Sequence, residues 1–452
     1  MTVKEAFSTS FKLTLPSLSA TLIPMPMKLE LIVPVKRKQN WKRNYQIAPL
    51  GMMYVAALTP LDIDVTITDE NIETIDFDKP VDLVGITSMT AEINRAYEIA
   101  GEYRKRGVKV VMGGIHPSLL PDEAIQHSDA VVVGEAEGAW HDVINDFKKN
   151  RLKKIYSSET RPSLENMVLP RRDIIKGKRY LTSNIIQTTR GCPFSCTFCT
   201  VTKFFGNAYR CRPVADVIRE VESLDGDFIV FIDDNILANP KRAKELFRAL
   251  IPYKKKWVSQ SSINLARDDE LLRLAAKSGC MGMFIGIESF SQESLRTIKK
   301  SVNQGFPAQD SIKKIQDHGI LVEGAFIFGL DGDNRDTLMR TVDFAVKMRL
   351  AAANFFVLTP FPGTSVREQL EGEGRIIEQD WSRYNNFTVV FRPKQMSPEE
   401  LQETAILAKQ QFFSYPSIIK RHFTKNHFPP TKKTIYSIAW NIFRRRLTTK
   451  RT

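Results

Sequence analysis

The sequence predicts an α/β protein with two successive domains and a basic helical C-terminal region. Three observations lead to this prediction. Short apolar runs alternate with amphipathic helical stretches over residues 28–150, and the same alternation repeats six times from residue 184 onward. Beyond Gln411 the chain has ten basic residues and no acid. With 452 residues, 42% of them hydrophobic, the chain is long enough for two globular cores.

Residues 1–27 are rich in Ser, Thr and Pro, and Glu5 is their only acid. We expect a disordered leader or an over-long start, with Met25 or Met27 beginning the fold. A cleaved transit peptide is the alternative.

Residues 28–150 are expected to form a doubly wound α/β domain. Open sheets of this kind bind ligands beyond the carboxyl ends of their strands. The expected strands are 29–35, 63–68, 83–87, 108–112 and 130–133, and the expected helices are 50–58, 91–106 and 139–149.

Small or turn-forming residues follow three of these strands, where they would let a ligand approach the backbone. They mark the ends of the third, fourth and fifth strands in sequence. The candidate ligand-binding residues of this domain are Thr87, Ser88, Gly113, Gly114, His116, Gly134 and Glu135.

A linker is expected over residues 151–180, where Pro162, Pro170 and clustered charges interrupt the pattern. The second domain follows at 181–393, and the basic helical region at 394–452. In the second domain, functional groups are expected at the carboxyl ends of the strands. The six expected strands are 184–188, 228–232, 257–262, 282–287, 322–328 and 354–358.

Three cysteines lie close together near the start of the second domain. Cys192, Cys196 and Cys199 have the spacing C-x3-C-x2-C, and three such thiolates can hold three irons of a cubane cluster while the fourth iron stays open. A structural zinc site would need a fourth ligand, and only Cys211 lies nearby. A disulfide would leave one thiol unpaired. The cluster is the leading interpretation and zinc is the alternative; Cys211 and Cys280 are expected to be buried thiols.

The cysteine motif resembles that of the radical S-adenosylmethionine (SAM) superfamily. The resemblance implies a [4Fe-4S] cluster whose open iron chelates SAM, which is cleaved to a 5′-deoxyadenosyl radical that abstracts hydrogen from the substrate. It also implies a partial (β/α)6 barrel, related to the TIM barrel, for the second domain. Gly329, after the fifth strand, would then present backbone to the adenine.

The same resemblance implies further SAM contacts. Phe198 would lie near the adenine or shield the cluster. Asp233 and Asp234 would accept hydrogen bonds from the methionine ammonium group, although they could instead cap the helix that follows. Glu288 and Ser289 would reach the ribose hydroxyls or the methionine carboxylate, although Ser289 could also be a helix cap.

The first domain resembles the cobalamin-binding domain that precedes the radical domain in one large class of these enzymes. The runs 48–51, 113–118 and 134–137 fall where such domains place their loops. A flavodoxin-like domain without a cofactor would have similar glycines, so the domain order favours cobalamin. No Asp-x-His-x-x-Gly sequence is present, and the resemblance therefore implies base-off cobalamin without a histidine ligand to cobalt. His116 is expected to orient its own turn.

Together the resemblances imply a cobalamin-dependent radical SAM enzyme, with a methyltransferase acting on an unactivated carbon as the leading prediction. The alternative is a radical cyclase or ring-rearranging oxidase on a tetrapyrrole or lipid-like substrate. A transfer-RNA methylthiotransferase would carry three more cysteines in the first domain, and this chain has none before Cys192. The expected partners are a small or lipid-like substrate and a one-electron reductant such as flavodoxin or ferredoxin.

Much of the net charge of +14 belongs to the C-terminal region, so the chain's basic character is no argument for a nucleic-acid partner. Apolar residues recur at helical spacing over 432–446. This stretch could lie on an anionic membrane or pack on the barrel. No apolar run is long enough for a spanning helix, and the cysteine usage suits a reducing cytoplasm. We expect a cytoplasmic enzyme with peripheral membrane contact as an open possibility.

Overall fold

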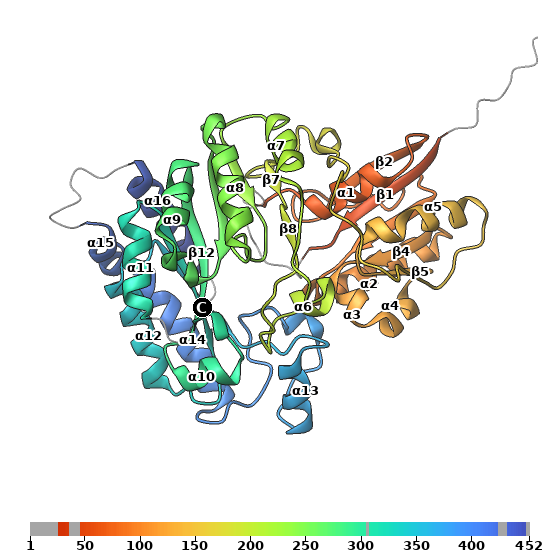
Figure 1. Ribbon diagram of the computed structural model, residues 1–452. Helices are drawn as coiled ribbons and strands as arrows, with labels where there is room; N and C mark the ends of the chain where they lie inside the picture. Colours follow the sequence, from red (N-terminus) through yellow and green to blue (C-terminus); the bar gives the residue numbers. More distant parts are fainter. Residues whose placement is uncertain (1–25, 36–45, 304–306, 424–431, 449–452) are drawn as a thin grey trace, which may run out of the picture.

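The computed structural model describes residues 26–35, 46–303, 307–423 and 432–448. It contains two six-stranded parallel sheets with a two-stranded ribbon between them (Figure 1). The predicted fold class is confirmed: an α/β domain is followed by an open barrel of strand–helix units. The predicted leader lies almost entirely outside the described residues, and the first strand begins at Met27.

The first sheet has the strand order β2-β1-β3-β4-β5-β6, and all its strands are parallel. The chain leaves β1 to one side for β2 and crosses to the other side for β3, so a crevice is expected above the carboxyl ends of β1 and β3. The strands are β1 (Met27–Val33), β2 (Ile63–Asp69), β3 (Leu83–Thr87), β4 (Lys109–Gly113), β5 (Ala130–Val133) and β6 (Ile155–Ser157).

Helices cover both faces of this sheet because side chains alternate along each strand. Leu31 packs in the core beneath α1 and α5, and its neighbour Ile32 packs in the separate core beneath α2. The edge strand β6 lies where the sequence predicted only a linker. The helices are α1 (Leu50–Leu58), α2 (Ile93–Lys105), α3 (Ile115–Leu119), α4 (Pro121–His127) and α5 (Trp140–Lys148), with 3₁₀ turns η1 (Thr90–Glu92), η2 (Ala136–Gly138) and, in the linker, η3 (Arg172–Ile175).

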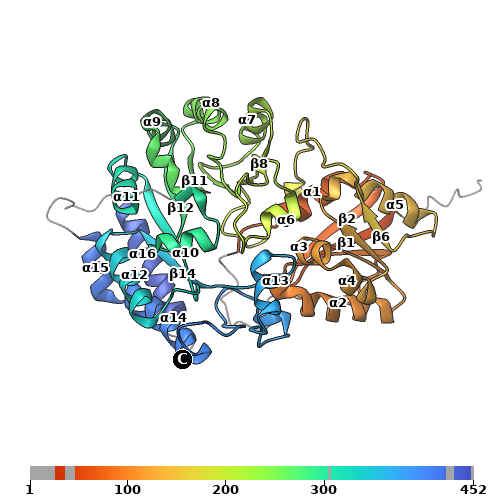
Figure 2. The ribbon, with the colours of Figure 1, turned by 60° about the horizontal axis from the view of Figure 1, so that its bottom comes forward.

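The second sheet has the order β14-β13-β12-β11-β10-β7. Each new strand is added beside the previous one, which builds an open barrel with helices outside (Figure 2). The strands are β7 (Ile185–Ile186), β10 (Phe228–Phe231), β11 (Lys256–Ser261), β12 (Cys280–Glu288), β13 (Leu321–Phe328) and β14 (Ala352–Val357).

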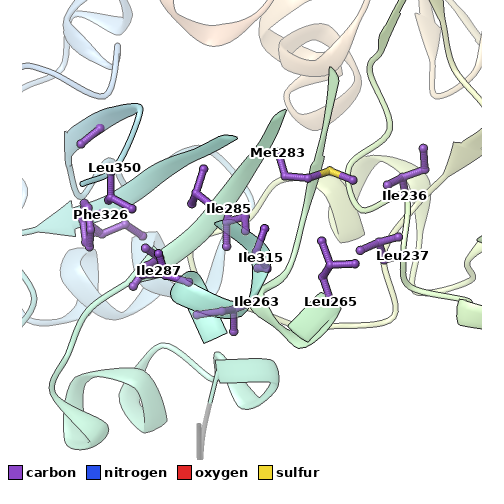
Figure 3. Close-up of a cluster of buried hydrophobic side chains, with 14 of the residues drawn as sticks. Ile236, Leu237, Ile263, Leu265, Met283, Ile285, Ile287, Ile315, Phe326 and Leu350 are labelled. Atoms are coloured by element: carbon purple, nitrogen blue, oxygen red, sulfur yellow. The ribbon is translucent and has the colours of Figure 1, made fainter. Parts of the chain in front are cut away.

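The main core lies between this sheet and its outer helices. Met283, Ile285 and Ile287 of β12 share one face at a period of two and pack toward Ile315 and Leu265 (Figure 3). The outer elements are α7 (Val214–Glu222), α8 (Pro240–Leu250), α9 (Asp269–Lys277), α10 (Gln292–Thr297), α11 (Ala308–Asp317) and α12 (Arg335–Lys347), with η4 (Ile251–Tyr253), η5 (Ile263–Arg267) and η6 (Ser301–Asn303).

A short antiparallel ribbon, β8 (Thr189–Arg190) and β9 (Arg210–Cys211), lies between the domains. The loop that joins its strands, 191–209, carries the three clustered cysteines and the helix α6 (Val201–Phe205). Figure 2 shows α6 and α13 (Ser365–Gly372) between the barrel and the first domain. The cysteine loop therefore faces both.

The segment after the barrel contacts the first domain and then covers the barrel. Trp381, in η7 (Trp381–Arg383), and Asp380 bond to Glu123 and Asn94 of the first domain. Three helices follow: α14 (Pro398–Phe412), α15 (Tyr415–His422) and α16 (Lys432–Thr448).

Candidate functional site

The three clustered thiols are all free and partly exposed at the carboxyl end of the barrel. The Cys199 N–H donates to the Cys196 carbonyl at 3.1 Å, which makes the loop turn tightly between them. Burial raises the pKa of each thiol, that of Cys199 to about 12. Among the described residues, no group of three His, Cys, Asp or Glu side chains is gathered closely enough to hold a single metal ion.

Two neighbouring aspartates after β10 differ sharply in their surroundings. Asp233 is fully buried, and its Oδ1 accepts hydrogen bonds from the Thr188 N–H (2.9 Å) and Oγ1 (3.1 Å) and from the Thr189 hydroxyl (2.6 Å). These bonds hold Oδ1 toward the ribbon, while Oδ2 is buried without a hydrogen-bond partner among the described residues, so a contact of Asp233 with SAM stays a prediction.

Asp234 is the carboxylate that faces the cysteines. Burial and, to a smaller extent, the charge of Asp233 raise its pKa to about 7, although the hydrogen bond from the Gly191 N–H opposes both. Its Oδ2 is buried without a hydrogen-bond partner among the described residues. A buried acceptor left open in this way is a place for a ligand donor.

After β12, Glu288 forms an ion pair with Lys300, whose Nζ lies 2.8 Å from Oε1. Both side chains are largely buried, and Lys300 also interacts with the thiols of Cys196 and Cys199. Burial alone would lower the pKa of Lys300, but Glu288 and these thiols outweigh it and raise that pKa. Sequence reasoning missed Lys300, because a lysine in an amphipathic helical stretch is usually solvated.

Other predicted SAM contacts have structural explanations in this geometry. The Ser289 hydroxyl accepts from the Ser291 N–H at 3.1 Å, so it supports the turn, and Ser291 rather than Ser289 caps α10. Gly329 has φ +96°, and a Cβ there would lie 2.7 Å from a Leu401 methyl group. Packing against α14 therefore accounts for this glycine. Phe198 packs against the barrel core.

A cavity of about 290 Å³ lies over the carboxyl edge of the first sheet. Five of the seven predicted residues of this edge line it, namely Thr87, Gly113, Gly114, Gly134 and Glu135. The barrel side contributes Gln187, Arg190, Phe204, Phe205 and Ile232. The cavity is therefore shared by the two domains.

A second cavity of about 910 Å³ adjoins the first, since Gly51, Met52 and Thr87 line both. Ser88 lines this second cavity. Together the two cavities extend along the crevice above β1 and β3, where a ligand much larger than either one could lie.

Gly114 gives the first cavity its closely packed floor. Its φ is +96°, and a Cβ would lie 2.8 Å from the Ser88 carbonyl oxygen and 2.8 Å from Thr87 Oγ1. Only glycine fits this turn without displacing the neighbouring strand end.

His116 does not line either cavity. Its side chain is completely buried, with Nδ1 3.2 Å from Thr90 Oγ1 and Nε2 3.3 Å from Glu123 Oε1. Both ring nitrogens are thus paired within the first domain, as expected of a residue that orients this turn, and its assignment as a ligand-binding residue stays a prediction.

Comparison with known proteins gives two family matches. Residues 186–345 match the radical SAM superfamily, and residues 41–144 match the B12 binding domain. Bacteriochlorophyllide d C-12(1)-methyltransferase of Chlorobaculum tepidum is 31% identical over 385 residues, which cover 82% of this chain and 84% of that protein. The anaerobic magnesium-protoporphyrin IX monomethyl ester cyclase of Rubrivivax gelatinosus is 26% identical, over 83% of this chain and 72% of that protein.

The same two-domain fold occurs in a solved structure. The radical SAM methyltransferase TsrM from Kitasatospora setae, with cobalamin and a [4Fe-4S] cluster bound, superposes with a TM-score of 0.65. The match covers 94% of this chain and 99% of that one at 17% identity, so it concerns the fold.

Proposed function

The chain belongs to the radical SAM superfamily, within the group whose members carry an N-terminal B12-binding domain, and from this premise we propose that it methylates an unactivated carbon of a large apolar ring compound. It is a cobalamin-dependent radical SAM enzyme of the methyltransferase group, with a [4Fe-4S] cluster, SAM and cobalamin as cofactors. The bacteriochlorophyllide methyltransferase named above supports the proposed substrate class.

The cysteine loop has the chemistry that a [4Fe-4S] cluster with bound SAM requires. Cys192, Cys196 and Cys199 supply the three thiols that would hold three of the four irons. We propose that the unpaired Oδ2 of Asp234 accepts a hydrogen bond from the ammonium group of SAM. We also propose that Lys300 neutralises the carboxylate of SAM. Glu288, held by Lys300, would then be available to the ribose hydroxyls.

The crevice of the first domain suits a large cofactor with an apolar tail. Its cavity is lined mostly by aliphatic and aromatic side chains, and Gly114 belongs to its closely packed floor. When bound, cobalamin would supply the methyl group, and the cluster with SAM would supply the hydrogen-abstracting radical. The residues of this chain orient the groups and exclude water.

The observation that carries this proposal is the position of the cysteine loop. Arg190 lines the cavity of the first domain, and Cys192 lies two residues further along the chain. A substrate held between the domains could therefore reach both cofactors in one site.

Isotope transfer tests the proposal. Anaerobically reconstituted enzyme is given SAM with a labelled methyl group, a bacteriochlorophyllide-type tetrapyrrole and a reductant. We expect label in the product, together with S-adenosylhomocysteine and 5′-deoxyadenosine. Ring closure of the substrate without label would favour the cyclase alternative. A one-electron donor is required, and we propose a flavodoxin or ferredoxin.

We also propose that the enzyme binds an anionic membrane surface through α15 and α16. Apolar and aromatic side chains are exposed there, and we call them the C-terminal face. Ile435, Tyr436 and Trp440 are 53%, 67% and 38% exposed. The C-terminal face consists of Tyr415, Ile419, Phe423, Ile435, Tyr436 and Trp440.

The polar side of α16 points into the protein, which leaves its apolar side outward. Asn441 is fully buried and donates to the Ala351 carbonyl at 2.6 Å, and its Oδ1 accepts from the buried Arg421 at 2.9 Å. Ser437 is also buried, against His422 Nε2 at 2.8 Å. This is the reverse of a helix that merely packs its apolar side on the barrel.

Charge favours an anionic surface over a second copy of the chain as the partner. Beyond Gln411 every charged residue is basic, so two such faces would repel each other. Among the described residues, no helix is long and apolar enough to cross a membrane. The contact would therefore be peripheral.

Vesicle flotation tests this contact. The chain should bind vesicles rich in phosphatidylglycerol and detach in high salt, but ignore pure phosphatidylcholine. The triple variant Ile435→Ser, Tyr436→Ser, Trp440→Ser should lose this binding, whereas the control Leu61→Ser, at a side chain 94% exposed on the first domain, should keep it. Equal vesicle binding by the two variants would refute the contact. It would also be refuted if the wild type formed dimers that the triple variant abolished and the control kept, because the face would then bind a second copy of the chain.

A further inference from the structure

The ribbon β8–β9 closes the base of the cysteine loop. Arg190 lies directly opposite Arg210, and Thr189 opposite Cys211, so residues 191–209 form the loop of this hairpin. Gly191 has φ +85°, and a Cβ there would lie 2.4 Å from the Ala208 carbonyl oxygen. The two ends of the cysteine loop are therefore held close together.

Two arginines opposite each other on a ribbon would normally push its strands apart. Here both guanidinium groups bind one carboxylate of the other domain. Arg190 Nη1 lies 2.6 Å from Glu135 Oε2, and Arg210 Nη2 bonds to Glu135 Oε1. The Glu135 side chain is 2% exposed, so water screens these contacts little.

Further bonds fix the orientation of Arg190. Its Nη2 lies 2.6 Å from Glu137 Oε1, and its Nε donates to Gln187 Oε1 at 3.0 Å. Burial raises the pKa of Glu137, but the bond from Arg190 outweighs this and leaves that pKa below its ordinary value. A planar guanidinium held at three nitrogens has little freedom to rotate.

The same residues form part of the wall of the 290 Å³ cavity. Glu135, Glu137 and Arg190 line it, as does Phe204 of the cysteine loop. A molecule that fills the cavity therefore touches the clamp that closes the cysteine loop. We call Glu135, Arg190 and Arg210 the interdomain clamp.

We propose that Glu135 is a positioning residue that couples the two cofactor sites, so that cobalamin in the cavity orders the cysteine loop and a cluster in the loop tightens cobalamin binding. Coupling between two binding sites is reciprocal, so each cofactor must raise the affinity for the other by the same factor. The inference rests on the two cofactors of the proposed function but not on methyl transfer.

Cobalamin affinity tests the coupling directly. Aquocobalamin is titrated, by its absorption spectrum, into protein with a reconstituted cluster and into protein whose iron has been removed. In the wild type we expect tighter binding with the cluster present, by about 5- to 150-fold. Glu135→Gln should bring that ratio close to one, because Arg190 and Arg210 lose the charge that holds them together. Glu102→Gln, which removes a surface ion pair with Lys105 on α2, should keep the wild-type ratio.

A wild-type ratio of one would overturn the proposal, as would an unchanged ratio in a folded Glu135→Gln protein. If that variant does not fold, hydrogen exchange of the wild type decides instead. Peptides covering 186–212 in cluster-loaded protein should exchange more slowly once aquocobalamin is added, and unchanged exchange there would also overturn the proposal. Neither measurement needs the substrate, so failure of the proposed methyl transfer would leave both results interpretable.

Discussion

Lys300 and Glu288 form a largely buried ion pair at 2.8 Å beside the cysteine loop, although Lys300 follows α10 and Glu288 ends β12. Glu288 has φ +64°, a conformation that non-glycine residues seldom adopt, and strained residues of this kind cluster at functional sites. The pair places a positive and a negative group together where SAM would present a carboxylate and hydroxyls.

Replacing Lys300 should therefore weaken SAM binding. Lys300→Met removes the positive charge that pairs with Glu288, and we expect at least tenfold lower affinity, consistent with about 1.5–3 kcal/mol for a hydrogen bond to a charged group. Calorimetric titration of SAM into cluster-loaded protein measures this. The exposed neighbour gives the control Lys299→Met, which should bind SAM normally. Equal affinities in the two variants would remove Lys300 from the site.

The cysteines make a second prediction. Stable reconstitution of the cluster should be abolished by each of the variants Cys192→Ala, Cys196→Ala and Cys199→Ala. Iron and sulfide content and the charge-transfer absorption in the visible region measure this. Cys280→Ala should reconstitute normally, because Cys280 is buried in the barrel core on β12. If Cys280 or Cys211 proved necessary and one of the three did not, the ligand assignment would have to change.

Local patterns predicted much of this fold, and long-range partners account for what was missed. The strand at 83–87 was predicted with the bounds of β3, because a short, nearly continuous buried apolar run can be recognised from the sequence alone. The ribbon β8–β9 was missed, because two-residue strands have no periodicity and Arg190 is paired with residues far along the chain. The edge strand β6 was missed for the same reason, since it has only three residues.

The candidate site divides in a similar way. The cysteine spacing and the glycines at strand ends carry their meaning locally, and Gly114 indeed lies on the floor of the cavity. Lys300 and the interdomain clamp depend on partners that only folding brings together. Asp233 and Asp234 are adjacent in sequence, yet one is bonded to the ribbon and the other interacts with the thiols of Cys192 and Cys199. No pattern in the sequence distinguishes them.

Gly114 predicts a defect in cobalamin binding. Gly114→Ala puts a methyl group 2.8 Å from the Ser88 carbonyl and forces an unfavourable φ, so the strand ends must shift. We expect a loss of about 1–3 kcal/mol in stability and weaker binding of aquocobalamin. Gly101→Ala on α2 is the control, because its Cβ meets nothing within 4 Å and should raise stability slightly. Normal cobalamin affinity in Gly114→Ala would show that this turn does not contribute to cobalamin binding.

Asp333 predicts a pH dependence of stability. Burial raises its pKa from 3.8 to about 6, against the N–H groups of Leu330 and Gly329 that donate to it. Because the pKa is higher in the folded state, the folded protein holds this proton more tightly. Protonated Asp333 therefore contributes fully to the free energy of unfolding below about pH 4, and this stabilisation is lost as pH rises through 6.

The variant Asp333→Asn should remove this dependence. The free energy of unfolding of the wild type, relative to the variant, should fall by up to about 3 kcal/mol between pH 4 and pH 6.5. Urea unfolding at several pH values measures it. Asp336→Asn, at an exposed carboxylate paired with Arg340 on α12, is the control and should follow the wild-type dependence on pH. If the free energy of unfolding of Asp333→Asn changed with pH as steeply as that of the wild type, the pH dependence would have to come from another group.

The contact between Trp381 and Glu123 predicts how the domains are held together. Trp381 Nε1 donates to Glu123 Oε2 at 3.1 Å, and Tyr97 and His116 of the first domain bind the other oxygen. Trp381→Phe keeps an aromatic ring beside Arg367 but removes this donor. We expect a loss of stability of about 1 kcal/mol, below the usual range for a hydrogen bond to a charged group, because Glu123 is partly exposed and water screens its charge. Faster hydrogen exchange over 115–127 should accompany it, since the segment after the barrel no longer fixes that loop.

Trp440→Phe on the C-terminal face makes the same chemical change at an exposed ring, and it should alter neither stability nor exchange at 115–127. Identical behaviour of the two variants would show that the indole bond contributes nothing to docking of the barrel on the first domain.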